Sequence, residues 1–229
     1  MRKTCPYLKT VLLTCALVFL LGGCAAMSRW FGEEEEKTPE QLMTEAVEHM
    51  EKGRYEAAAE AFRKVKDRYP YSKFAVEAEL KTADALFRQE LYPEALDDYA
   101  EFERLHPKNR HIPYVIFQKG MCHFLQVSTV DRDQTHSRLA REEFERLVKR
   151  FPRDLHARKA RLKIRQCIIN LAEYELYVAR FYMKSGHFRA AVGRFRHLLE
   201  TYPDLGQYRE ALKSMGVCLR KLAEAQEKS

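Results

Sequence analysis

GRYEAAAEAFRKVKDRYP, residues 53–70, is the stretch of sequence that decides the fold. Its Ala58, Phe62 and Val65 are four and three residues apart, so they lie on one face of a helix. A small residue on that face lets a second helix approach closely, and the aromatic ring fills the space beside it. The glycine at the start ends a preceding helix, and the proline at the end stops this one. The stretch therefore predicts the second helix of a helical hairpin.

The same pattern occurs three more times. The later copies keep Tyr92, Ala95, Tyr99, Phe102 and Pro107, then Ala140, Phe144, Leu147 and Pro152, and finally Gly186, Phe188, Ala191, Phe195, Leu198 and Pro203. The helices that precede them carry matching small residues at Ala46, Ala83, Gly120 and Ala179. This arrangement resembles the tetratricopeptide repeat, whose unit of about 34 residues is a helical hairpin. With 9 Gly and 8 Pro, the chain has too few turn residues for a many-stranded sheet, and we predict an all-α, tetratricopeptide-like solenoid of about five hairpins.

The repeats are unevenly spaced along the chain. Residues are inserted at about 127–137, and a helical pattern runs without Gly or Pro from about Leu155 to Lys184. A helix of roughly 30 residues would span about 45 Å. We expect this helix to link an N-terminal cluster of repeats, residues 39–153, to a C-terminal cluster, residues 154–229. The last helix, about Gln207 to Glu227, has the polar end that is expected of a solenoid cap.

The first 23 residues have the features of an export signal. Three bases, Arg2, Lys3 and Lys9, stand around the start of an apolar run that is shorter than the roughly 20 residues needed to cross a bilayer. Leu-Gly-Gly then precedes Cys24, which resembles the lipobox of bacterial lipoproteins. We expect residues 1–23 to be the signal peptide and Cys24 to carry N-acyl and S-diacylglycerol lipid. The alternatives are an uncleaved anchor and a lipid-free secreted protein.

Residues 24–38 are expected to form a lipidated, acidic tether, because four consecutive glutamates repel one another and bury nothing. Ala25 stands where an inner-membrane retention signal would usually have Asp, so the resemblance favours the periplasmic face of the outer membrane. Acids exceed bases in residues 33–60, and bases exceed acids in residues 132–166. This asymmetry suits oriented docking to protein partners. Nucleic acid is the competing partner for the basic segment, but a lipid-anchored periplasmic protein would not meet it.

The sequence offers little catalytic or metal-binding chemistry. Besides Cys24, the mature chain has Cys122, Cys167 and Cys218, none in CxxC spacing and each within a helical pattern, so buried thiols are expected. Cys122 and His123 are adjacent on a helix and point about 100° apart, so they cannot easily share one metal ion. The usual nucleotide, zinc, calcium and serine-hydrolase motifs are missing. We predict no catalytic residues, no metal, and no cofactor other than the lipid on Cys24.

Three longer strings accompany the repeat pattern, and one of them contains Arg-Asp-Gln-Thr at residues 132–135, which is far more specific than the repeats alone. They are YPYS at residues 69–72, DRDQT at residues 131–135 and LAEYELYVARFY at residues 171–182. Together with the lipobox they resemble the BamD family, lipoproteins of outer-membrane β-barrel assembly. The resemblance covers about Cys24 to Gln226, and the chain departs from it by its acidic tether and short C-terminal tail.

The resemblance implies a periplasmic scaffold of the β-barrel assembly (BAM) complex rather than an enzyme. Its N-terminal groove would receive unfolded outer-membrane proteins through their C-terminal β-signal. Its C-terminal cluster would bind the barrel-forming BamA subunit, in company with other assembly lipoproteins. The alternative is a pilotin or cell-envelope adaptor with the same repeats, which would serve secretin assembly or peptidoglycan synthesis.

The groove of such a solenoid is lined by the first helix of each hairpin. In the second and third hairpins, with the turn before them, these faces offer Tyr71, Glu77, Leu80, Asp84, Phe87, Tyr114, Phe117 and Met121. The aromatic rings and the methionine could hold apolar side chains of an extended β-signal. The alternative is that about half of them pack between hairpins, with Phe87 and Phe117 the first candidates for that role.

Arg194, on the second helix of the fourth hairpin, is the residue we expect to contact BamA. It occupies the arginine position that follows the family's Gly-x-aromatic string. A planar guanidinium pairs with a carboxylate through two parallel hydrogen bonds. Arg180, Arg189 and Arg196 are weaker candidates for the same surface. The alternative for Arg194 is an exposed arginine without a partner.

Overall fold

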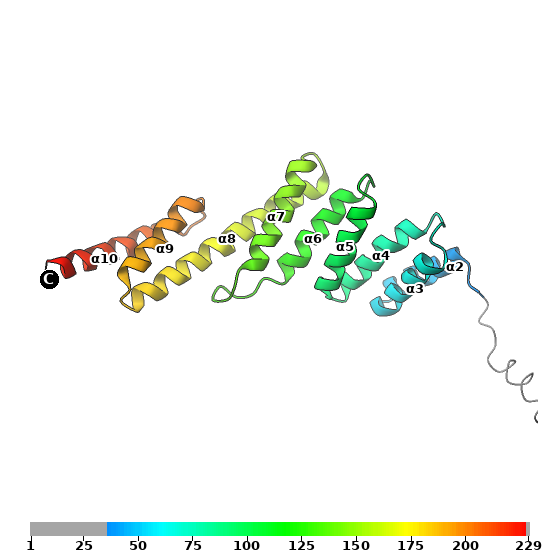
Figure 1. Ribbon diagram of the computed structural model, residues 1–229, viewed down its shortest axis with the longest axis horizontal. Helices are drawn as coiled ribbons and strands as arrows, with labels where there is room; N and C mark the ends of the chain where they lie inside the picture. Colours follow the sequence, from blue (N-terminus) through cyan, green and yellow to red (C-terminus); the bar gives the residue numbers. More distant parts are fainter. Residues whose placement is uncertain (1–35, 228–229) are drawn as a thin grey trace, which may run out of the picture.

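The computed structural model describes residues 36–227, which form nine α-helices and no strand (Figure 1). The helices are α2 (Pro39–Glu51), α3 (Tyr55–Arg68), α4 (Ala75–Arg88), α5 (Tyr92–Leu105), α6 (Ile112–Leu125), α7 (Thr135–Arg150), α8 (Leu155–Lys184), α9 (Phe188–Thr201) and α10 (Tyr208–Gln226). Each helix packs against the next along the chain. They form an elongated row with α2 at one end and α10 at the other (Figure 1). The predicted all-α solenoid of helical hairpins is confirmed.

The described part begins just before α2. Thr38 caps this helix, because its Oγ1 accepts a hydrogen bond from Gln41 N at 3.3 Å and its own N–H donates to Gln41 Oε1 at 2.8 Å. The predicted signal peptide, the lipidation site Cys24 and the tether as far as residue 35 lie outside the described residues. Among residues 36–227, no helix has the length and apolar character needed to cross a membrane.

The repeat pattern buries the residues that it marks. Ala58, Phe62 and Val65 of α3 are completely buried, and the corresponding Phe144 and Phe195 are buried in the later hairpins. Two helices approach closely in the third hairpin, where a Cβ atom added to Gly120 would lie 2.5 Å from Cε1 of Phe144. A small residue is therefore required at this crossing point.

Tight turns join the two helices of three hairpins. Gly53 ends the first helix of its hairpin with φ +70°, and Gly186 does so with φ +76°. Glu90 takes the same place after α4 with φ 63°, a left-handed conformation that costs a non-glycine residue about 1 kcal/mol or more. In the third hairpin the insertion between α6 and α7 replaces this turn.

Helix α8 is the long helix that the sequence predicts, with its bounds at Leu155 and Lys184 as expected. Asp154 starts it, because its side chain accepts a hydrogen bond from His156 N at 2.7 Å. One cluster of buried side chains runs from α4 through α7 and reaches Cys167 on α8. Another begins at Leu176 and continues through α9 and α10. Helix α8 is therefore a rigid connection between hairpins on either side of it (Figure 1).

Candidate peptide-binding groove and docking surface

A groove of about 810 Å³ opens beside α4. Glu77, Leu80 and Asp84 are three and four residues apart, so one face of α4 presents all of them to the groove. Tyr114 near the start of α6 and His156 near the start of α8 complete the opposite side. The remaining lining residues are Lys73, Val76, Lys81, Phe102, Asn109, Arg110 and His111. Three successive hairpins therefore contribute to one concave surface.

Asp84 anchors the floor of this groove. Tyr99 and Tyr114 donate their hydroxyl hydrogens to its Oδ1 at 2.7 and 2.6 Å, and Lys81 Nζ lies 3.2 Å from its Oδ2. Burial, followed by the nearby Asp84 carboxylate, raises the pKa of both tyrosines, so they stay protonated donors at neutral pH. Because the three donors come from α4, α5 and α6, the carboxylate ties these helices together.

The lining of the groove carries more bases than acids. Lys73, Lys81 and Arg110 line it together with the acids Glu77 and Asp84. Burial lowers the pKa of His156, so this imidazole is neutral at neutral pH. Its ring lies 5.4 Å from that of Tyr114, edge to face. The groove thus combines an apolar and aromatic wall with positive groups at its edge.

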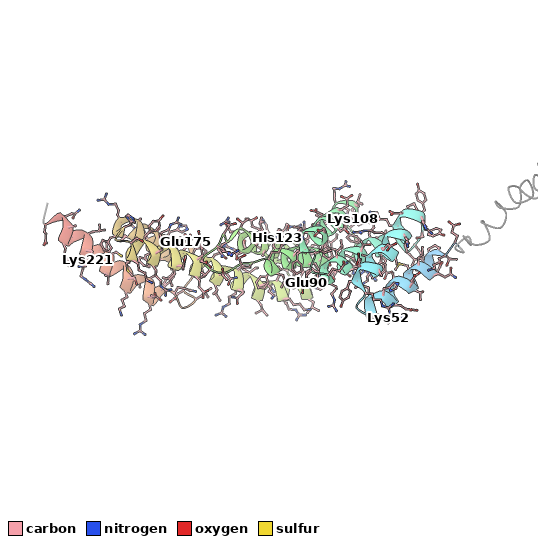
Figure 2. All side chains as sticks on the ribbon, turned by 90° about the horizontal axis from the view of Figure 1, so that it is seen from below. Lys52, Glu90, Lys108, His123, Glu175 and Lys221 are labelled. Carbon is pink, nitrogen blue, oxygen red and sulfur yellow. The ribbon has the colours of Figure 1, made fainter. Side chains whose placement is uncertain are left out.

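Four predicted docking arginines lie on the C-terminal hairpin, which is formed by the second half of α8 and by α9. Arg194 Nη1 lies 3.3 and 3.1 Å from the two carboxylate oxygens of Glu175, which is 7% exposed. Arg180 Nε donates to Glu210 Oε1 at 2.5 Å and links α8 to α10. Arg189 and Arg196 are exposed and have no ion-pair or hydrogen-bond partner for their side chains within residues 36–227. Figure 2 shows Glu175 on the half of α8 that lies near α9.

Residues 35–229 match the YfiO family, described as outer membrane lipoprotein. The chain belongs to this family. It is 33% identical to outer membrane protein assembly factor BamD of Caulobacter vibrioides over 78% of this chain and 58% of that protein. It is 32% identical to the BamD of Rickettsia prowazekii over 89% of this chain and 81% of that one. The chain therefore spans little more than half the length of the Caulobacter relative.

A crystal structure of a tetratricopeptide repeat protein from Parabacteroides merdae is also similar to this chain, with a TM-score of 0.43 and 15% identity. That similarity covers 82% of this chain and 76% of the other. The two relatives named above are called outer membrane protein assembly factors. Membership agrees with the prediction that the chain is not an enzyme.

The eight predicted groove residues fall into three groups in this YfiO-family member. Glu77, Leu80, Asp84 and Tyr114 line the groove. Tyr71 is 100% exposed in the turn between α3 and α4 and lies outside the groove lining.

The other three pack between helices. The ring of Phe87 lies 5.5 Å from that of Tyr92, and the ring of Phe117 lies 5.6 Å from that of Phe144. Met121 packs against the same core cluster. These positions match the alternative that the sequence left open, namely packing between hairpins.

Eight residues of the groove lining were not among those predicted, namely Lys73, Val76, Lys81, Phe102, Asn109, Arg110, His111 and His156. Lys73, Arg110 and His111 come from the turns that precede α4 and α6, and His156 comes from the first turn of α8. The sequence shows that these turns contain basic residues, but only the packing of the three hairpins shows that these residues face the groove. No local pattern marks His156.

The family-specific DRDQT string shapes the insertion. Gln134 is 2% exposed, and its Nε2 donates to the carbonyl oxygens of Thr129 and Arg132, both at 3.1 Å. Its Oε1 accepts a hydrogen bond from Ser137 Oγ at 2.9 Å. Gln134 therefore closes the loop and fixes the first turn of α7, which is a structural role.

Cys122, Cys167 and Cys218, the cysteines within residues 36–227, are buried, as predicted. Burial raises the pKa of the Cys122 thiol to about 12 and that of Cys167 to about 11. Both side chains stay protonated at neutral pH and are poor nucleophiles. Within residues 36–227, no three His, Cys, Asp or Glu side chains are grouped so that they could hold a metal ion.

Proposed function

We propose that this chain is a lipid-anchored periplasmic scaffold of outer-membrane β-barrel assembly. In this proposal the groove beside α4 receives the C-terminal β-signal of an unfolded outer-membrane protein. The C-terminal hairpin docks a BamA-like barrel subunit, and lipid on Cys24 holds the protein at the membrane. Membership of the YfiO family and the names of the relatives support the assembly role.

The groove is the single observation that carries the substrate part of the proposal. It is lined on one side by Val76 and Leu80 and on the other by Tyr114, so it offers an apolar strip for alternate side chains of an extended segment. Lys73 and Arg110 stand at its edge, where they can attract the terminal carboxylate of a chain end. The tie between Asp84 and the two tyrosines keeps this wall rigid before a ligand arrives.

Binding of a peptide tests the groove. A fluorescein-labelled peptide with the sequence of the last strand of an outer-membrane porin should bind the full chain in mild detergent, as measured by anisotropy. Arg110→Glu places a negative charge at the rim, and we expect it to weaken binding at least tenfold. Lys108→Glu makes the same charge change in the same turn, at a residue that does not line the groove (labelled in Figure 2), and should leave binding unchanged. Equal effects of the two variants would contradict the proposed site.

The contact with the barrel subunit has its own test. We expect the tagged lipoprotein to recover a BamA-like barrel from detergent-solubilised outer membranes. Recovery of a secretin without such a barrel would support the pilotin alternative instead. Arg194→Glu would also set two acids against each other at Glu175, so the double variant Arg189→Glu/Arg196→Glu provides the cleaner surface change. Loss of recovery in Arg194→Glu alone, with full recovery in the double variant, would assign the effect to the lost internal ion pair.

A further inference from the structure

Helix α10 ends the described row of helices with one face open. Its neighbours are α9 and, to a smaller extent, α8. Figure 1 shows no helix on its other side. In each hairpin before it, a first helix is covered by the second helix of the same hairpin, so the open face of α10 is where such a helix would lie.

Gly216 marks this place on α10. It follows Pro203 at the same spacing at which Ala83 follows Pro70 and Gly120 follows Pro107. Ala83 is completely buried, and Gly120 is in contact with the ring of Phe144 from the second helix of its hairpin. At Gly216 an added Cβ atom would meet nothing within 4 Å. The crossing point for a second helix is present, but no described residue occupies it.

Two apolar side chains flank this glycine on the same face. Leu212 lies four residues before it and is 53% exposed, and Leu219 lies three residues after it and is 48% exposed. Of the matching places in the second and third hairpins, Ile116 is 0% exposed and Leu86 is 5% exposed, and the other two hold Glu79 and His123. The face of α10 therefore has the composition of a covered first helix without its cover.

Charge indicates what would cover it. Arg209, Lys213 and Arg220 run beside the apolar stripe, are exposed, and have no ion-pair or hydrogen-bond partner for their side chains within residues 36–227. On the other side of the helix, Lys221 (labelled in Figure 2) is paired with Glu224 at 2.9 Å. The bases left without a partner are thus those that border the open face. They complement acidic side chains on an incoming helix.

We propose that the open face of α10 binds an acidic amphipathic helix of a partner protein, in the place that a second helix takes in the earlier hairpins. The chain itself shows which pattern fits, since its second helices carry a small residue, an aromatic residue four later and an apolar residue three after that. Helix α5 follows this pattern with Ala95, Tyr99 and Phe102 and is strongly acidic. The partner helix has this stripe with Asp and Glu beside it. This surface shares no residue with the lining of the groove beside α4.

A synthetic helix tests this proposal. The probe is a fluorescein-labelled peptide with the sequence of α5, residues 92–105, held helical by a staple outside its apolar stripe, because free peptides of this length are marginally helical in water. We expect saturable binding to the full chain in mild detergent, measured by anisotropy. A peptide with its acids changed to Lys should not bind. Equal binding of both peptides would overturn the proposal.

Variants of the chain locate the site. Arg209→Glu/Lys213→Glu/Arg220→Glu should weaken binding at least tenfold. The matched control with the same charge change, at exposed bases of α8 whose side chains also have no partner within residues 36–227, is Arg158→Glu/Lys159→Glu/Arg165→Glu and should bind normally. Similar losses in both triple variants would show that only net charge matters and would overturn the assignment.

The size of the side chain at residue 216 provides a further test of the site. Gly216→Phe should fill the crossing point and weaken binding at least tenfold, whereas Gly216→Ala copies Ala83 and should keep binding. If Gly216→Phe is unstable by circular dichroism, Leu212→Lys/Leu219→Lys removes the apolar stripe without removing positive charge and should give the same loss. Unchanged binding in these variants would overturn the proposal. So would a dimer of the unaltered chain in sedimentation velocity that Gly216→Phe abolishes, because the occupant would then be a second copy.

Discussion

The middle hairpins and the C-terminal hairpin follow one pattern but are held together differently. In α4 to α7 the polar contacts between helices centre on buried or half-buried acids, since Asp84 joins three helices and Glu103 meets Arg146 and Lys119. In α8 to α10 only one acid, Glu175, is buried, where it meets Arg194, and the pair of Arg180 with Glu210 is exposed on both sides, at 42% and 45%.

The difference has a functional meaning. First helices of the middle hairpins are covered on both sides, so the groove between them is fixed before a ligand arrives. Helix α10 is covered on one side only, and regions with fewer buried contacts open at lower free energy. We therefore expect the middle of the solenoid to be the rigid part and the C-terminal end to be the adaptable one. The following predictions test this contrast, from the largest expected effect to the smallest.

Loss of the Phe144 ring should have the largest effect. The ring is completely buried, fills the space beside Gly120 and contacts Phe117 and Phe124. Phe144→Ala should lower the free energy of unfolding by about 3–5 kcal/mol, as measured by urea denaturation followed by circular dichroism. The control is Phe195→Ala, in the C-terminal core. It should speed amide hydrogen exchange in α9 and α10 while α4 to α6 stay protected. If amide hydrogen exchange in this control became equally fast in α4 to α6 and in α9 and α10, the C-terminal end would not be less stable than the middle.

Removal of the Asp84 carboxylate should have the next largest effect. Asp84→Ala leaves the hydroxyls of Tyr99 and Tyr114 without their acceptor in a buried site, which costs roughly 2–3 kcal/mol. Glu175→Ala should cost less, about 1 kcal/mol, because the exposed guanidinium of Arg194 can turn to water. Urea denaturation of the two variants side by side measures the difference. A larger loss in Glu175→Ala would reverse the proposed order of rigidity.

The charge of Glu103 should give a smaller, pH-dependent effect. Burial acts to raise the pKa of this carboxyl, but hydrogen bonds and charges from Arg146 and Lys119 outweigh it, so the pKa is lowered. A carboxyl with a lowered folded-state pKa contributes stability in full above its ordinary value of 4.5, and this stability is lost as the pH falls through the lower folded value. Glu103→Gln should therefore cost about 1–2 kcal/mol at neutral pH and less in acid.

The matched control for Glu103 is Glu210→Gln, which removes the carboxylate from an exposed pair with Arg180. We expect it to change stability by less than about 0.5 kcal/mol. Urea denaturation at neutral pH and again below the ordinary carboxyl pKa distinguishes the two. A cost for Glu103→Gln that stays constant with pH would mean that shape, and not charge, matters at this position.

Most of the fold could be read from the sequence because its pattern is local. Ala58, Phe62 and Val65 lie within two helical turns of one another. The absence of Gly and Pro between Leu155 and Lys184, which predicts the long helix, is likewise a local feature of the sequence. The exposed face of α10 was not predicted as a surface, because the sequence shows the stripe but not the absence of its cover. Gln134, from the DRDQT string, shapes a loop. This role depends on its contacts with Thr129, Arg132 and Ser137, which the sequence alone does not show.

The groove was predicted less completely, for a geometric reason. The first helix of a hairpin has one face toward the groove and another toward the next hairpin, and both carry aromatic side chains. Asp84 and Tyr114 fall on the groove face, whereas Phe87 and Phe117 pack between helices. Residues such as His156 reach the groove from a distant part of the chain, so no spacing in the sequence could have placed them.

The smallest effect should come from Gly216, and the sign of its effect should separate the C-terminal end of the molecule from the middle. Gly216 lies within α10, where glycine costs a helix up to about 1 kcal/mol relative to alanine, and an added Cβ atom meets nothing. Gly216→Ala should therefore raise the free energy of unfolding by about 0.5–1 kcal/mol. Gly120→Ala gains the same helix propensity, but its Cβ would lie 2.5 Å from the ring of Phe144, so overpacking by about 1–3 kcal/mol should outweigh the gain. Urea denaturation shows directly whether each of the two variants has a higher or a lower free energy of unfolding than the unaltered protein. Destabilisation by Gly216→Ala would mean that the open face of α10 is already filled in the isolated protein.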